Sequence, residues 1–259
     1  MRIVWDKEVR ADLVVLSSAD WEEYAWAHGR VTNFSFLRIG DVIAYEHCVL
    51  QLVRKELFCG EDGLLHAGWN CRVLEGNPAQ EERDCFLKHR GLSLAWIALS
   101  DKGARGERED VSGPAIREIV SGAMEICLSR GMVIPDEPDI LKHILTDFCL
   151  FQGFDLVITT GGTGVGPRDI TPDVTYTLLD KRLPGFEQAM MAAALKKTPR
   201  GAISRAVAGT MGLSLVVNLP GSLKAVRENL LSVLPAIRHA IEKLQGTVQI
   251  GRASCRERV

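Results

Sequence analysis

Residues 156–173 read LVITTGGTGVGPRDITPD, and this stretch decides the fold. Its first five residues are an unbroken apolar and β-branched run, which is typical of a strand buried on both faces of a parallel sheet. Four glycines follow between residues 161 and 166. Thr171, Pro172 and Asp173 then have the composition of a helix start, with a capping hydroxyl, a proline in the first turn and an acid near the helix dipole. The stretch therefore predicts a strand, a glycine loop and a helix in succession.

The same rhythm continues through the chain after residue 91. Apolar runs at 94–99, 132–134 and 213–219 predict strands. Apolar residues at helical spacing predict helices over about 111–129, 137–151, 172–180, 186–196 and 222–244. This alternation predicts a three-layer α/β domain over residues 91–249, with a mostly parallel sheet and helices on both faces. Ligands of such sheets bind beyond the carboxyl ends of the strands.

The first 75 residues lack this alternation. Short apolar runs at 12–16, 41–45 and 48–53, bounded by turn residues, predict a small β-rich domain over residues 1–75, whose role is left unassigned. Residues 76–90 combine Gly, Asn and Pro with a charge run and predict a linker, with a long surface loop inside one domain as the alternative. The Arg-rich stretch 250–259 changes character abruptly and is expected to be a non-native tail.

Composition excludes several classes of partner. The 259 residues are 46% hydrophobic and 25% charged, with a net charge of −2, so neither nucleic acid nor an anionic membrane is expected to bind. No apolar run approaches the roughly 18 residues that cross a bilayer, and the N-terminus makes a poor signal peptide, so a cytoplasmic location is expected. The seven cysteines include no C-x-x-C pair, which favours reduced thiols. Zinc held by cysteines between residues 48 and 85, with His47, His66 or His89, is the alternative.

Three loops that follow predicted strands carry residues suited to phosphate. In the loop from Gly161 to Gly164, glycines let the backbone approach a ligand and turn its N–H groups toward an anion, although a purely structural turn is the alternative. Arg168 and Asp169 come between these glycines and a helix start, where a phosphate is stabilised. The other two loops are 100–110 and 218–222, for which a solvated loop and a helix cap are the plainer interpretations.

Taken together, the motifs of these loops resemble the MogA/MoaB-like molybdopterin-binding domain, and specifically the molybdopterin adenylyltransferases. The motifs that carry the resemblance are Ser100-Asp101, Asp110-x-Ser112-Gly113-Pro114, Ile134-Pro135-Asp136, the run from Thr160 to Asp173, Pro184-Gly185-Phe186, Ser204-Arg205-Ala206 and Asn218-Leu219-Pro220-Gly221-Ser222. They cover residues 91–245, about three-fifths of the chain.

The resemblance implies that AMP is transferred from ATP to the terminal phosphate of molybdopterin, assisted by Mg²⁺. It makes Asp136 and Asp169 the functional carboxylates, which hold Mg²⁺ or orient the pterin phosphate, with helix-start acids facing solvent as the alternative. The residues expected to bind substrate are Ser100, Asp101, Gly161, Gly162, Thr163, Gly164, Arg168, Thr171, Pro220, Gly221 and Ser222. For Arg168 the alternative is an ion pair with Asp169 or Asp173.

The resemblance also implies a homotrimer and contact with the downstream molybdenum-insertion protein, and it leaves open whether molybdenum or tungsten is inserted. A non-catalytic molybdopterin carrier is the competing function. A CinA-like nucleotide hydrolase is disfavoured by Thr163 and by the run from Asp169 to Pro172.

Overall fold

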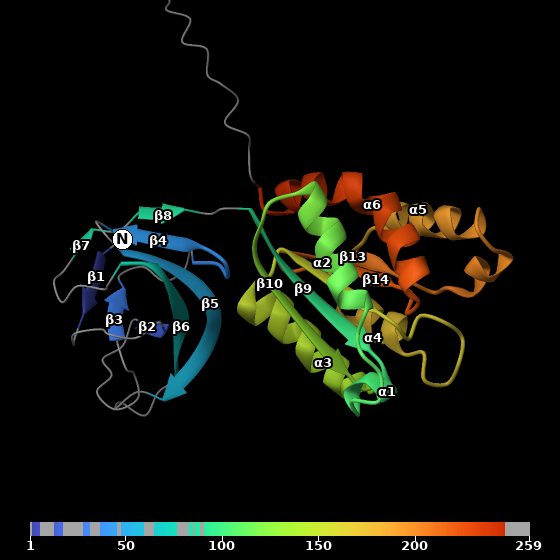
Figure 1. Cartoon of the computed structure of the whole chain (residues 1–259), viewed down its shortest axis with the longest axis horizontal. Helices are drawn as coiled ribbons and strands as arrows, with labels where there is room; N and C mark the ends of the chain where they lie inside the picture. Colours follow the sequence, from blue (N-terminus) through green and yellow to red (C-terminus); the bar gives the residue numbers. More distant parts are fainter. Residues whose placement is uncertain are drawn as a thin grey trace, which may run out of the picture. The chain divides into compact units, whose positions relative to one another are not determined.

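The computed structural model describes residues 2–5, 13–17, 28–31, 37–45, 48–59, 65–76, 83–84, 86–88 and 91–246 (Figure 1). Contacts between residues divide the chain into two compact units. The first comprises the chain up to Ala95 together with Met124–Arg130 and Thr146–Phe154, and the second comprises Trp96–Ala123, Gly131–Leu145 and the chain from Asp155 onward. The expected tail at 250–259 lies outside the described residues.

An eight-stranded sheet forms the first unit, in the order β7-β1-β3-β2-β6-β5-β4-β8. Its strands are β1 (Arg2–Trp5), β2 (Leu13–Ser17), β3 (His28–Val31), β4 (Val42–Tyr45), β5 (Cys48–Cys59), β6 (Leu65–Glu75), β7 (Arg83–Asp84) and β8 (Phe86–Lys88). β2 and β3 pair in parallel, whereas β5 and β6 form a long antiparallel pair. Ile39, Ile43, Leu50, Leu52 and Trp69 are buried among these strands, so the predicted β-rich N-terminal region is confirmed.

The expected linker over residues 76–90 is partly wrong, because β7 pairs with β1 and β8 pairs with β4. Both partners are remote in sequence, and a turn-like composition does not reveal such pairing. The first unit also includes segments from beyond residue 91. There the Gln152 side chain accepts a hydrogen bond from the Lys55 N–H (2.9 Å) and donates one to the Lys55 carbonyl (3.0 Å), much as a neighbouring strand would.

The side chains of Cys48, Cys71 and Cys149 are buried. Burial raises the pKa of the Cys71 thiol well above its ordinary value, which keeps it protonated. His47, Cys85 and His89, which belong to the zinc alternative, lie outside the described residues.

The second sheet has six strands in the order β10-β9-β11-β14-β13-β12. Its strands are β9 (Leu92–Leu99), β10 (Ile126–Ile134), β11 (Leu156–Thr160), β12 (Lys181–Arg182), β13 (Ala208–Met211) and β14 (Ser214–Leu219). The helices are α1 (Asp101–Ala104), α2 (Ser112–Ala123), α3 (Pro138–Thr146), a π-helix (Asp147–Gln152), α4 (Thr171–Leu178), α5 (Pro184–Leu195), a 3-10 helix (Pro199–Ile203) and α6 (Leu223–Leu244). None of the described helices is both long enough and apolar enough to cross a membrane.

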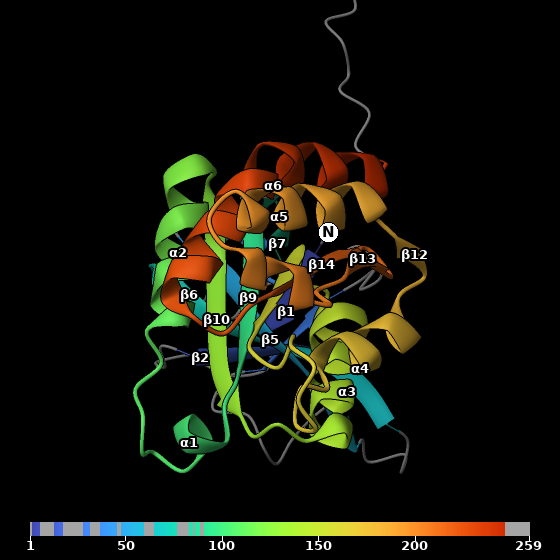
Figure 2. The same ribbon diagram turned by 90° about the vertical axis from the view of Figure 1, so that its right-hand side faces the viewer.

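Helices cover both faces of this sheet. Figure 2 shows α2, α5 and α6 on one side of the strands and α3 and α4 on the other. In the centre, β11 and β14 pair in parallel from Leu156 opposite Leu215 to Thr160 opposite Leu219, and every residue of both strands is buried. The predicted three-layer, mostly parallel α/β architecture is therefore confirmed. β13 and β12, which the sequence analysis does not predict, add two antiparallel strands at one edge.

The predicted helix over 111–129 is too long, because α2 ends at Ala123 and β10 begins at Ile126. Hydrophobic periodicity does not distinguish a short apolar run at a helix end from the start of a strand. Trp96 of β9 accounts for two glycines near these elements. A Cβ atom at Gly113 or at Gly131 would overlap the Trp96 indole, so the ring fills the space beside the start of α2 and beside β10.

Candidate functional site

The glycine loop begins where β11 ends. Gly161 has φ 99° and Gly162 has φ 61°, both in the left-handed region that favours glycine. A Cβ atom at Gly161 would collide with the carbonyl oxygen of Leu99 on β9, and one at Gly162 would lie 2.6 Å from the Thr171 hydroxyl oxygen. These two glycines are therefore required by the path of the backbone itself.

Hydrogen bonds from the sheet and from α4 fix this loop. The Thr160 hydroxyl donates to the Pro220 carbonyl (2.8 Å), and the Gly161 N–H donates to the Leu219 carbonyl (3.1 Å). The hydroxyl of Thr171 donates to the Gly161 carbonyl at 2.8 Å. The sequence predicts that Thr171 caps α4 through that hydroxyl, but Ile170 occupies the cap position and makes no side-chain cap. The hydroxyl is instead used to hold the loop.

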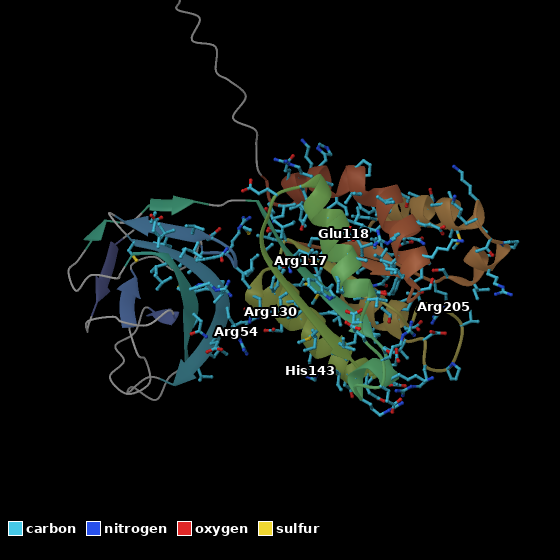
Figure 3. The ribbon with its side chains drawn as sticks, in the orientation of Figure 1. Arg54, Arg117, Glu118, Arg130, His143 and Arg205 are labelled. Carbon is cyan, nitrogen blue, oxygen red and sulfur yellow. The ribbon has the colours of Figure 1, made fainter. Side chains whose placement is uncertain are left out.

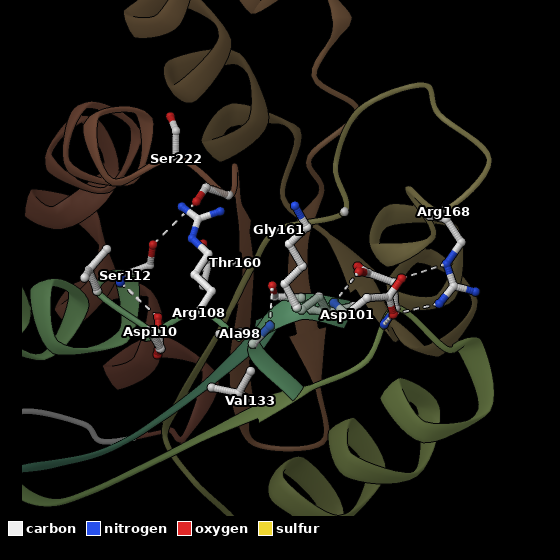
Figure 4. A pocket seen from close by; sticks show the side chains of 18 of the residues that line it. Ala98, Asp101, Arg108, Asp110, Ser112, Val133, Thr160, Gly161, Arg168 and Ser222 are labelled. Carbon is white, nitrogen blue, oxygen red and sulfur yellow. Dashed lines mark hydrogen bonds and ion pairs between the residues drawn. The ribbon is translucent and has the colours of Figure 1, made fainter. Parts of the chain in front are cut away.

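A cavity of about 440 Å³ opens beside the loop (Figure 4). It brings together residues that follow four different strands, β9, β10, β11 and β14. Nine of the expected site residues line it: Ser100, Asp101, Asp136, Gly161, Gly162, Arg168, Asp169, Gly221 and Ser222.

Four expected substrate-binding residues do not line the cavity. Thr163 and Thr171 are buried, and Gly164 and Pro220 contribute backbone hydrogen bonds to neighbouring segments. Their positions in the motif reflect the construction of the loop rather than exposure to the cavity.

Several lining residues were missed by the sequence analysis, foremost Lys102 and Arg108. Both come from the 100–110 loop, and Figure 4 shows the Arg108 side chain extending into the pocket from there. Neither forms an ion pair with any described residue, so their charges are available to a ligand. The cluster of charges in this loop could have indicated these two residues, but a charged loop is more often solvated than part of a site.

Asp101 and Asp136 are linked by a reciprocal pair of hydrogen bonds. The Asp101 N–H donates to the Asp136 carboxylate (3.1 Å), and the Asp136 N–H donates to the Asp101 carboxylate (3.0 Å). Their pKa values nevertheless shift in opposite directions. Hydrogen bonds from Arg168 and from the Asp136 backbone lower the pKa of Asp101, whereas desolvation raises the pKa of Asp136, with Asp101 and Asp169 adding negative charge nearby.

Arg168 joins the segments that follow β9, β10 and β11 rather than standing free in the cavity. Its guanidinium donates to both carboxylate oxygens of Asp101 (2.8 and 3.2 Å) and to Glu137 (2.9 Å). The ion pair considered for Arg168 therefore exists, but its partners are Asp101 and Glu137 instead of Asp169 or Asp173. The expected partners are neighbours in sequence, while the observed ones approach only because the strands end at one edge of the sheet.

Asp169 stabilises the turn that carries it. One carboxylate oxygen accepts a hydrogen bond from the Gly166 N–H at 2.7 Å. The other oxygen of Asp169 and the second oxygen of Asp136 accept no hydrogen bond from the described residues. These two oxygens therefore remain available for a cation.

Helix starts account for the remaining polar side chains. The Asp110 carboxylate accepts hydrogen bonds from the N–H groups of Ser112 and Gly113 and so caps α2. Ser100 caps α1 and Ser222 caps α6 through their hydroxyl oxygens. For Ser222 the plainer interpretation as a cap is thus confirmed, and the residue lines the cavity as well.

Comparison with known proteins assigns a family to this arrangement. Residues 95–239 match the family model described as "Probable molybdopterin binding domain", which covers more than half of the chain. The chain belongs to this family. The match contains Asp101, Asp136, the glycine loop and Ser222, and it leaves the first 94 residues outside.

Individual relatives agree with the family. The chain is 40% identical over 156 residues to the molybdopterin adenylyltransferase of Helicobacter pylori strain J99, covering 60% of this chain and 89% of that protein. The crystal structure of the molybdopterin biosynthesis enzyme MoaB from Thermus thermophilus is similar at 44% identity and a TM-score of 0.55, covering 60% of this chain and 97% of that one. The tungsten cofactor synthesizing protein MoaB from Pyrococcus furiosus is similar at 33% identity and a TM-score of 0.53, with 60% and 97% covered.

Proposed function

We propose that this chain transfers AMP from ATP to the terminal phosphate of molybdopterin and releases pyrophosphate. The observation that carries the proposal is the meeting of Asp136 and Asp169 with the glycine loop at one cavity. Acids and phosphate-binding backbone at the same edge of the sheet suit transfer between two phosphorylated substrates better than simple retention of one. The adenylyltransferase of Helicobacter pylori supplies the precedent for the reaction.

The bond changes in this reaction are few. An oxygen of the molybdopterin phosphate forms a bond to the α-phosphorus of ATP, and the bond from that phosphorus to the oxygen bridging the β-phosphorus breaks. Pyrophosphate leaves with the electron pair. Such transfers need alignment and charge neutralisation more than a strong base. Lys102 and Arg108, whose charges are not neutralised by described carboxylates, are suited to hold phosphate oxygens in line.

Mg²⁺ fits the acidic side of the cavity. Among the described residues no cluster of three or more His, Cys, Asp or Glu side chains could enclose a metal ion. Magnesium, however, is commonly held by one or two carboxylates plus substrate phosphates. The uncommitted oxygens of Asp136 and Asp169 would supply those carboxylates. The bound ion would neutralise charge on the transferred phosphates.

The test is a turnover assay with the full chain. Protein, molybdopterin, ATP and Mg²⁺ are incubated, and both pyrophosphate and adenylylated molybdopterin are measured. Asp169→Asn is expected to remain folded and to lose turnover by a factor of about a thousand or more, since a charge-stabilising group is removed. Asp139→Asn, which changes an exposed acid of α3 outside the cavity, is the matched control and should keep full turnover.

Two outcomes would overturn the assignment. Binding of molybdopterin by the parent chain without release of pyrophosphate would identify a carrier. Full turnover by Asp169→Asn would remove this carboxylate from the mechanism. Four further expectations stay predictions. The homotrimer is tested by molecular mass in solution, and contact with the molybdenum-insertion protein is tested by co-purification. The cytoplasmic location is tested by cell fractionation, and the choice between molybdenum and tungsten by metal analysis of the downstream product.

A further inference from the structure

The carbonyl groups of the glycine loop are all hydrogen-bonded within the chain. Thr171 binds the first two, with its hydroxyl donating to Gly161 (2.8 Å) and its N–H donating to Gly162 (3.0 Å). Arg205 binds the next two, with its N–H donating to Thr163 (2.9 Å) and its Nε donating to Gly164 (2.7 Å). Four consecutive carbonyls are thus held by two residues from outside the loop.

This arrangement fixes the direction of the N–H groups. The structure has no cis peptide among its described residues, and in a trans peptide the N–H points opposite to the carbonyl of the same unit. The N–H groups of residues 162–165 therefore point away from Thr171 and Arg205. No described residue accepts a hydrogen bond from any of these four. Successive N–H groups without an acceptor in the chain are suited to an oxyanion, and Gly162, the first of these four residues, lines the cavity.

Arg205, which Figure 3 labels, also joins the loop to the helix that follows it, α4. Besides Nε on Gly164, its Nη2 donates to the Asp169 carbonyl and its Nη1 donates to both carboxylate oxygens of Asp173 (2.7 and 2.9 Å). Each guanidinium nitrogen thus holds a different point between residues 164 and 173. Arg205 itself does not line the cavity.

We propose that Arg205 is a positioning residue, which holds the glycine loop in the conformation that leaves its N–H groups free for a pyrophosphate-type oxyanion, at the end of the loop where Gly162 lines the cavity. The identity of the anion rests on the proposed function, because ATP and the pyrophosphate product both carry that group. Three nitrogens in one plane perform this task, and the single ammonium group of lysine cannot reach three separate acceptors.

The test measures anion binding directly, using the full chain titrated with inorganic pyrophosphate in a calorimeter. Arg205→Ala is expected to weaken pyrophosphate binding about 10- to 100-fold, since it removes charged hydrogen bonds that order the loop. Arg205→Lys should recover less than half of that loss on a logarithmic scale, and millimolar guanidinium should restore part of the affinity of Arg205→Ala. Arg200→Ala is the matched control, because it also removes an arginine charge, from the 3-10 helix just before Arg205. Its guanidinium has no partner among the described residues, so its affinity for pyrophosphate should stay within about twofold of the parent.

The outcomes separate this inference from the proposed function. If Arg205→Ala lowers only the melting temperature, while its folded fraction binds pyrophosphate like the parent, Arg205 is merely structural and the inference fails. It fails too if the parent does not bind pyrophosphate, or if Arg205→Lys binds as well as the parent. A parent chain that binds pyrophosphate without transferring AMP would refute the proposed function alone. The ratio of the pyrophosphate affinities of the parent and Arg205→Ala would still decide the role of Arg205.

Discussion

Replacing Thr171 by valine should remove the hydrogen bond that holds the first carbonyl of the glycine loop. Thr171 is fully buried, and its hydroxyl is the only described donor to the Gly161 carbonyl, at 2.8 Å. Valine has the same shape and the same β-branching, so α4 should still form. It cannot donate, however, and a methyl group does not fit 2.8 Å from a carbonyl oxygen without displacing it.

The expected cost follows from this geometry. Leaving a buried carbonyl without its donor costs about 1–3 kcal/mol. For a chain of this size, each kcal/mol lowers the melting temperature by about 2–4 °C, so a decrease of about 2–12 °C is expected. Affinity for pyrophosphate should fall as well, since the first peptide of the loop is no longer held.

Thr177→Val provides the matched control, because Thr177 lies in the same helix and its exposed hydroxyl donates to the Val174 carbonyl, its one partner among the described residues. Urea unfolding followed by circular dichroism and pyrophosphate calorimetry are run on both variants. A Thr171→Val protein as stable and as tightly binding as Thr177→Val would show that the buried hydroxyl does not set the loop.

Three further substitutions probe other parts of the site. Burial raises the pKa of Asp136, so the contribution of this carboxyl to stability is present below its ordinary pKa and is lost as pH rises through the raised value. Asp136→Asn should therefore be more stable than the parent at pH 7, and urea titrations should show this difference shrinking toward pH 4. The variant should also be inactive. Gly162→Ala should lose turnover and about 1 kcal/mol or more of stability, because φ there is 61° and the new methyl meets the Thr171 hydroxyl; a stable, active variant would contradict this. Asp110→Ala should cost about 0.5–2 kcal/mol by uncapping α2, and unchanged unfolding would argue against the cap.

Local patterns were sufficient to predict the elements that build the site. The apolar run of β11, the glycines after it and the helical periodicity of α6 are each encoded within about 20 residues, and all three were placed within a residue or two. The cavity itself was predictable because parallel strands deliver their following loops to one edge of the sheet.

Features that depend on contacts between distant residues were not predictable. Arg168 meets Asp101, 67 positions away, rather than its neighbours in sequence. β13 pairs with β14, although the β13 segment has no recognisable strand pattern. β7 and β8 pair with strands far upstream in the sequence. In each case the sequence contains suitable residues, but the choice among partners is made by the folded chain.

The indole of Trp96, packed where Gly113 and Gly131 leave room for it, provides an optical probe of this region. The other four tryptophans are Trp5, Trp21, Trp26 and Trp69, all in the first 75 residues. Replacing those four by phenylalanine would leave one emitter beside the start of α2, close to the Asp110 carboxylate. Its emission wavelength and quenching by iodide would then report on the end of the pocket near α2 as substrates are added, in real time and without an attached dye.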